Sequence, residues 1–174
     1  GPDAPYKGAN AGYHSRILKE TEKASPGYYE VELYDHRVKA AMTATTRCSF
    51  QKYIFPECTD SRILMDLLFP TEWDYGFSVK EATIEQVSDT RIEGYAKCVS
   101  GAWSRWNDWT LYFSIRFSKP FDSFNGWKGT EVTENINKIS GSDEMGAYVT
   151  YKTAENEEIL IQTGLSLVSI EGAR

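Results

Sequence analysis

The segment Thr110–Ser118 has the sequence TLYFSIRFS, in which apolar and polar side chains alternate. Leu111, Phe113, Ile115 and Phe117 occupy every second position, and the positions between them carry hydroxyl or charged groups. A β-strand points successive side chains to opposite faces. This segment therefore predicts a strand with one buried face and one wetter face.

The same two-residue period recurs along the chain on both sides of this segment. The other predicted strands are Tyr28–Leu33, Val38–Ala44, Phe50–Phe55, Ile63–Leu68, Phe77–Val87, Arg91–Val99, Ala147–Tyr151, Glu158–Gln162 and Leu165–Ile170. Ile63–Leu68 is mostly apolar, as expected of a central strand, and no segment has the pattern of a long amphipathic helix. The sequence thus predicts an all-β fold, an antiparallel β-sandwich, forming one domain over residues 1–174.

Turns and loops are expected between these strands. Ser88-Asp89-Thr90 predicts a tight hairpin, and Thr153–Asn156 predicts a second one. Loops are expected at Gly1–Gly12, Ser100–Asp108 and Lys119–Gly141, and the last is long for a compact domain.

Composition excludes several function classes. The 174 residues carry 25 acidic and 19 basic side chains, a net charge of −6, without a long basic cluster, so nucleic acid is not an expected partner. No apolar run approaches the roughly 20 residues of a membrane span, and no signal peptide is recognisable in the sequence.

The cysteines and histidines offer little for catalysis or metal binding. The chain has three cysteines, Cys48, Cys58 and Cys98, and an odd number cannot all pair within one chain. A disulfide between Cys48 and Cys58 is possible, but the favoured interpretation is that the cysteines are small, buried apolar side chains. With only His14 and His36, the chain has no zinc-site spacing and little material for a histidine-based triad.

Four segments, in this order, carry a resemblance to a known family. They are Glu22–Leu33 (EKASPGYYEVEL), Lys39–Arg47 followed by Tyr53–Pro56, Leu111–Phe113 followed by Phe117–Phe121, and Thr163–Arg174 (TGLSLVSIEGAR). Together they resemble glycoside hydrolase family 92, the calcium-dependent exo-acting α-mannosidases. The resemblance covers nearly the whole chain and corresponds to the later part of that family's N-terminal β-sandwich.

The resemblance implies a supersandwich-like, galactose-mutarotase-like fold that packs on a helical catalytic domain. In that family the general acid and base lie on the helical barrel, and the sandwich contributes some sugar contacts at the junction. Inverting hydrolysis needs two carboxyl groups about 6.5–9.5 Å apart, so a chain without the barrel is expected to be inactive alone. No cofactor is expected in this chain, because calcium in the family is bound mainly outside this segment. The resemblance also implies a bacterial protein that is secreted, periplasmic or on the outer cell surface.

The sequence departs from the family pattern at two polar positions. Leu18–Glu22 stands where the family often has Ser-His-x-Asn-Glu, and Gln51 stands where a histidine often precedes the Tyr-x-Phe-Pro segment. Both positions are ones that could face a sugar, so the family's substrate contacts are not simply transferable.

Two groups of residues are candidates for sugar binding. The first surrounds the predicted loop after Val99, where indole rings can stack on sugar faces and polar side chains can bind hydroxyls: Trp103, Arg105, Trp106, Asn107, Asp108 and Trp109. These tryptophans could instead cap the sandwich or pack on the missing barrel. The second is the carboxylate pair Glu20 and Glu22, on one side of an extended chain; a solvated loop edge is the plainer interpretation.

The sequence leaves two functions open. The first is an accessory module of an α-mannosidase-like enzyme, which packs on the helical domain and shapes a cleft for mannose-containing glycans. The second is a free-standing carbohydrate-binding or cell-surface module that uses the tryptophan-rich loop alone. An exposed apolar patch on the isolated chain would favour the first.

Overall fold

The computed structural model describes residues 15–67, 78–100, 107–142 and 144–174, which form thirteen strands and one short helix. The strands are β1 (Ile17–Ser25), β2 (Tyr28–Leu33), β3 (Val38–Ala44), β4 (Cys48–Phe55), β5 (Cys58–Asp66), β6 (Ser78–Ser88), β7 (Arg91–Ser100), β8 (Asn107–Phe117), β9 (Ser123–Lys128), β10 (Glu131–Thr133), β11 (Lys138–Gly141), β12 (Met145–Thr153) and β13 (Glu157–Ser166). The helix, α1, covers Ile170–Ala173. No helix in the described ranges is long and apolar enough to cross a membrane.

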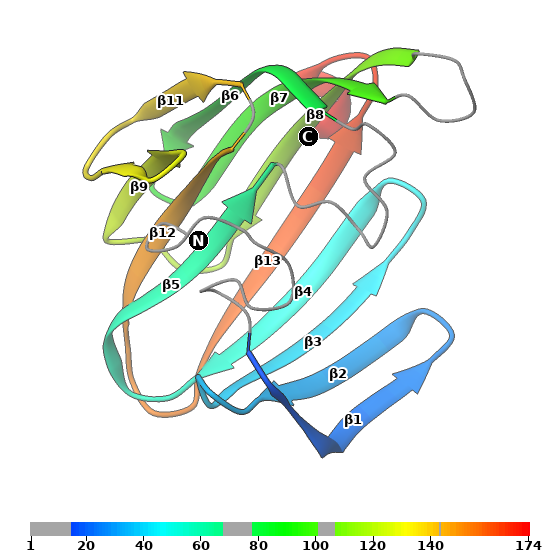
Figure 1. Cartoon of the computed structure of the whole chain (residues 1–174). Coiled ribbons are helices and arrows are strands. Elements are labelled where there is room, and N and C mark those ends of the chain that lie inside the picture. Colours follow the sequence, from blue (N-terminus) through cyan, green and yellow to red (C-terminus); the bar gives the residue numbers. More distant parts are fainter. Residues whose placement is uncertain (1–14, 68–77, 101–106, 143) are drawn as a thin grey trace.

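The strands form two stacked antiparallel sheets, which confirms the predicted β-sandwich (Figure 1). The larger sheet has the order β1-β2-β3-β4-β13-β8-β7-β6-β11, and the smaller has the order β10-β9-β12-β5. Figure 1 shows β1, β2 and β3 extending to one side, beyond β5 at the edge of the smaller sheet. We call the face of the larger sheet toward the smaller one the inner face, and the opposite face the outer face.

The core lies between the sheets and uses the alternating residues that the sequence indicates. Phe113, Ile115 and Phe117 of β8 are buried, and they pack with fully buried residues such as Ile159 of β13 and Tyr151 of β12. Burying each such side chain stabilises the fold by roughly 1.5–3 kcal/mol. The other side chains of β8 therefore belong to the outer face.

The predicted loop Lys119–Gly141 is wrong, because this segment contains β9, β10 and β11. Four consecutive residues of β9, Phe124–Trp127, are buried, so the two-residue alternation is absent there. A Cβ at Gly126 would lie 2.6 Å from the Cδ1 atom of Ile139, so glycine lets β11 pack closely on β9. A strand covered on both sides gives no alternating signal.

Two of the strand predictions also need correction. Leu165–Ile170 is not a separate strand: β13 ends at Ser166, and Ser169 caps α1 by accepting a hydrogen bond from the Gly172 amide at 3.1 Å. The strand predicted at Ile63–Leu68 begins earlier, at Cys58, and lies at an edge of the smaller sheet rather than in its centre.

The predicted loop Ser100–Asp108 is also shorter than expected. Ser100 ends β7, Asn107 and Asp108 begin β8, and residues 101–106 lie outside the described residues, as do residues 1–14. Both predicted hairpins are confirmed, with Asp89 and Thr90 forming the two-residue turn between β6 and β7.

The cysteines are all free. Cys98 is buried, as a small apolar side chain would be, but Cys48 is exposed and Cys58 is only partly buried. The described structure therefore contradicts the Cys48–Cys58 pair and also the burial of all three.

Candidate functional site

The tryptophan-rich candidate lies only partly within the described structure. Trp103, Arg105 and Trp106 fall outside the described residues. Asp108 is exposed at the start of β8, whereas Trp109 is half-buried and packs against the core. Trp109 pairs with buried Cys98 of β7, so its side chain belongs to the inner face. Its use as a sugar platform stays a prediction.

The two candidate glutamates have different surroundings. Glu20 lines a hollow of about 400 Å³ with Glu30, Glu32, Lys39 and Lys52, a surface of mixed charge. Pairing between β1 and β2 is irregular from Leu18 to Lys23. Glu22 is not among the residues that line this hollow, so the two carboxylates do not face a common cavity as an acid–base pair would.

Glu22 is held by two neighbours. It forms an ion pair with Lys19 and accepts a hydrogen bond from the Tyr29 hydroxyl at 2.8 Å. The hydrogen bonds from Lys19 and Tyr29 lower the pKa of Glu22, so this carboxyl is anionic near neutral pH and is not a proton donor there.

Gln51, the second position where the sequence departs from the family pattern, lies on the same face of the larger sheet as Tyr29, the partner of Glu22. Tyr29 pairs with Met42, and Met42 pairs with Gln51, so these three side chains share the inner face across β2, β3 and β4. We call them the inner-face row. Two strand spacings of about 4.8 Å place its ends about 10 Å apart.

Gln51 is oriented by hydroxyl groups along β4. Its Oε1 atom accepts a hydrogen bond from Tyr53 at 3.0 Å, and its Nε2 atom donates to Ser49 at 3.4 Å. Gln51 ends the inner-face row at β4, and at its other end Tyr29 binds Glu22, the ion-pair partner of Lys19. Lys19 and Gln51 are both positions where the sequence departs from the family pattern. A lysine and an amide give this surface hydrogen-bonding capacity, but neither titrates near neutral pH as a histidine does.

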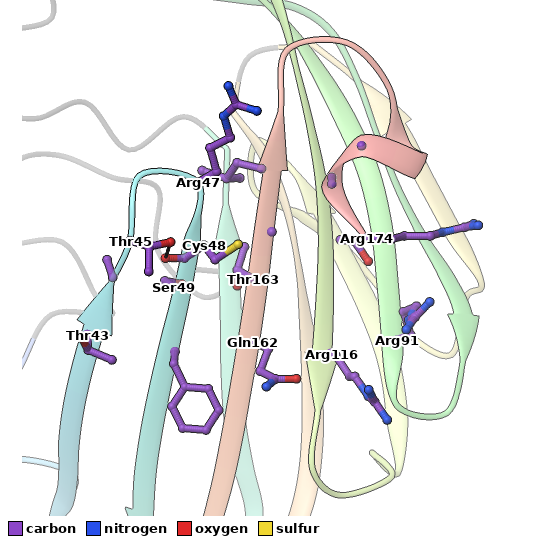
Figure 2. Close-up of a pocket in the computed structure, with 17 residues that line it drawn as sticks. Thr43, Thr45, Arg47, Cys48, Ser49, Arg91, Arg116, Gln162, Thr163 and Arg174 are labelled. Atoms are coloured by element: carbon purple, nitrogen blue, oxygen red, sulfur yellow. Dashed lines mark hydrogen bonds between the residues drawn. The ribbon is translucent and has the colours of Figure 1, made fainter.

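A second hollow, of about 490 Å³, lies on the outer face (Figure 2). Its lining residues come from the end of β3 and the start of β4, from β7, β8 and β13, and from the end of the chain; the charged ones are Arg47, Arg91, Arg116 and Arg174. No acidic residue of the described ranges lines it. Figure 2 shows Arg91, Arg116 and Arg174 toward one side, whereas Arg47 points away from them.

One acidic side chain, Glu93, is buried beneath this arginine side of the hollow. Arg174 donates two hydrogen bonds to its carboxylate, both of 2.9 Å, and the Ser114 hydroxyl donates a third at 3.1 Å. Arg91 lies farther off, with its Nη1 atom 3.9 Å from the Glu93 Oε1 atom. These partners, Arg174 foremost, lower the pKa of Glu93 although its burial acts in the opposite direction.

None of the four arginines of this hollow is among the candidates that the sequence indicated for sugar binding. The available signal was the alternation of Thr110–Ser118, which already assigns Arg116 to the wetter face. The opposition of Arg91 and Arg116 depends on the register between β7 and β8, which the alternation within a single strand does not specify.

The described residues do not fit a calcium site. No three or more His, Cys, Asp or Glu side chains among them are grouped so as to hold a metal ion. Calcium prefers several carboxylate and carbonyl oxygens, whereas the charged residues that line the outer-face hollow are arginines.

The fold defines the class of the chain: a two-layer antiparallel β-sandwich with a nine-stranded sheet and a four-stranded sheet. The sequence profile of the glycosyl hydrolase family 92 N-terminal domain matches residues 3–166. The chain belongs to this family of domains. This finding confirms the resemblance carried by the four sequence segments.

Solved structures with the same fold include bacterial α-mannosidases. The family GH92 α-mannosidase BT3965 from Bacteroides thetaiotaomicron, solved in complex with mannoimidazole, is 29% identical with a TM-score of 0.79; the match covers 94% of this chain and 21% of that one. A second structure of the same α-mannosidase matches at 27% identity and a TM-score of 0.77, over 92% of this chain and 21% of that one.

A more distant structure supports the fold alone. The family GH92 inverting mannosidase BT2199 from the same organism is 20% identical with a TM-score of 0.72, over 91% of this chain and 20% of that one. The chain thus spans about a fifth of the length of the solved structures that it matches. No curated protein matches the chain.

Proposed function

We propose that the chain is a non-catalytic module of an α-mannosidase-like glycoside hydrolase, which packs on a helical catalytic domain and shapes one wall of a mannoside-binding cleft. The observation that carries this proposal is the match of residues 3–166 to an N-terminal domain whose solved relatives are about five times longer. We further propose a secreted, periplasmic or outer-surface location, where glycans are accessible.

Exposed apolar side chains support the docking part of the proposal. Directly after β13, the side chains of Leu167 and Val168 are 68% and 83% exposed, and Leu165 within the strand is 38% exposed. Three such residues in one short segment are costly to leave in water, and apolar surface of this kind commonly marks a contact with another domain. We expect this segment, called the Leu165–Val168 patch, to be covered by the catalytic domain.

The inner-face row supports the cleft part. It combines the amide of Gln51, the Tyr29–Glu22 pair and the partly exposed Met42 on a face that the smaller sheet does not cover at this end. Amide, hydroxyl and carboxylate groups bind sugar hydroxyls, and an aromatic ring packs on the C–H face of a sugar. In the proposed function these groups contact the substrate, while the catalytic domain supplies the acid and the base.

The experiment begins with the native reading frame around this sequence. The encoded polypeptide is expressed whole, α-mannoside hydrolysis is measured, and the same assay is applied to the 174-residue chain, which should show no turnover. Leu167→Asp with Val168→Asp should then lower the activity of the whole protein and expose the patch to hydrogen exchange. Thr59→Asp, an exposed position on β5, serves as the control.

Two results would reject the proposal. The first is turnover by the 174-residue chain alone. The second is a reading frame without a helical domain, together with mannose binding by the isolated chain. That second pair of results would favour the free-standing carbohydrate-binding module, and loss of the binding in Trp103→Ala or Trp109→Ala would locate it at the tryptophan-rich segment.

A further inference from the structure

Two arginines oppose each other directly on the outer face. Arg91 of β7 and Arg116 of β8 are a cross-strand pair, so their Cβ atoms are about 5 Å apart and both side chains leave the same face. Like charges in this relation destabilise a sheet. Such a pair is expected to persist where an anion offsets the repulsion.

The nearby carboxylate of Glu93 offsets this repulsion only in part, through a long ion pair with Arg91. Glu93 uses both of its oxygens to bind Arg174 and one of them to bind Ser114, while Arg91 remains 3.9 Å away. Among the described residues, no ion pair joins Arg116 to an acidic side chain, and the hollow is lined by no acidic residue. This positive surface belongs to a chain whose net charge is −6.

The row that contains the two arginines continues with groups suited to a sugar. Arg116 pairs with Gln162 of β13, and Gln162 pairs with Phe50 of β4. Phe50 is 38% exposed although it is a large apolar residue. Four strands at about 4.8 Å spacing make this outer-face row, Phe50–Gln162–Arg116–Arg91, about 14 Å long, which is enough for one or two sugar units.

We propose that the outer-face row binds an anionic sugar. The guanidinium groups of Arg91 and Arg116 bind its carboxylate or phosphate, because a planar guanidinium presents paired N–H donors to an oxyanion. The Gln162 amide binds a hydroxyl, and the exposed Phe50 ring packs on the C–H face of the sugar. The site lies on the face opposite to the inner-face row, and its test uses the chain without a catalytic domain.

The test uses the 174-residue chain and four probes: glucuronate, glucose 6-phosphate, inorganic phosphate and glucose. Binding is measured by isothermal titration and by shifts of the Gln162 and Arg116 amide signals in NMR spectra. At least one of the two anionic sugars should bind more tightly than inorganic phosphate, and glucose should bind far more weakly than either. The two anionic sugars distinguish a carboxylate ligand from a phosphate ligand.

Variants separate the site from general charge attraction. Arg116→Gln should weaken binding of the preferred anionic sugar by about tenfold or more, since a hydrogen bond to a charged group is lost. Phe50→Ala should weaken the sugar but not inorganic phosphate. Arg37→Gln, which removes the same charge at the turn between β2 and β3, should leave both unchanged.

The outcomes that overturn the proposal are equally specific. They are an absence of binding for every anionic probe, equal weakening by Arg116→Gln and Arg37→Gln, or inorganic phosphate binding as tightly as both anionic sugars. Arg116→Gln removes an exposed, like-charged side chain, so the variant should fold, and its circular dichroism and melting curve verify this.

Discussion

Arg174 holds the buried carboxylate of Glu93 with two hydrogen bonds of 2.9 Å, from the end of the chain to the middle of β7. The Glu93 side chain is only 4% exposed, whereas that of Arg174 is 49% exposed. This ion pair fixes α1 on the outer face, where the alternation of the strands alone would leave Glu93 in water.

Glu93→Gln should destabilise the domain. A neutral amide keeps the size of the side chain, but it has only one acceptor oxygen and no charge, so it cannot keep both charge-assisted hydrogen bonds from Arg174. We expect a loss of about 1–3 kcal/mol in the free energy of unfolding. Urea titration measures it. Glu85→Gln is the matched control, since Glu85 pairs with Glu93 across the strands but is 48% exposed and bound to Lys138. Equal effects of the two substitutions would contradict the role given to Glu93.

The same carboxyl predicts part of the acid sensitivity of the fold. Arg174 lowers the folded-state pKa of Glu93 below the usual value for a glutamate, about 4.3. The stabilisation is therefore fully present above the unfolded-state pKa and is lost as the pH falls through the folded-state pKa. The melting temperatures of the wild type and Glu93→Gln should differ by a constant amount from pH 7 to 5 and should converge below about pH 4.5. A difference that grows on acidification would refute this assignment.

Gly164→Ala should displace α1. A Cβ at Gly164 would lie 2.0 Å from the carbonyl oxygen of Ala173. This oxygen belongs to the backbone, so the clash cannot be relieved by a change of side-chain rotamer. We expect a loss of about 1–3 kcal/mol and faster hydrogen exchange at the Arg174 amide. Gly141→Ala is the control, because its added Cβ would meet only the flexible ends of Met145 and Lys128, at 3.3 and 3.4 Å. Unchanged exchange at Arg174 in the Gly164 variant would contradict the close packing.

Arg116→Gln should raise the melting temperature in buffer without oxyanions. The substitution relieves the repulsion from Arg91, which is worth a few tenths of a kcal/mol, so a rise of about 1–2 °C is expected. Calorimetry in a phosphate-free buffer of low ionic strength measures it. A lower melting temperature would mean that Arg116 makes a stabilising contact that outweighs this repulsion.

The strands that alternate in sequence were the predictable part of the fold. β8 shows this best, because its buried Phe113, Ile115 and Phe117 all face one side. β9 escaped prediction because it is buried on both faces, and α1 escaped because its helix has only four residues and depends on the cap at Ser169. Short elements of this kind are set by tertiary contacts rather than by local pattern.

The candidate sites were predictable to a smaller extent. Glu22 and Gln51 stood out as positions in or beside the family motifs, yet only strand pairing brings their surroundings to one face. Glu93 carried no signal, because its burial requires α1 and Arg174, which lie about 80 residues farther along the chain. Contacts between segments so distant depend on register and topology, which one sequence specifies only through the whole fold.

The position of β1 at the edge of the larger sheet has a consequence for self-association. An edge strand offers unpaired amide and carbonyl groups to any other chain in solution, and long regular edges promote aggregation. β1 carries the charged residues Lys19, Glu20, Glu22 and Lys23 close together, and its pairing to β2 is irregular at these positions. Charge and an uneven backbone make this border a poor template for another strand, so the nine-stranded sheet can stay wide without recruiting a second molecule.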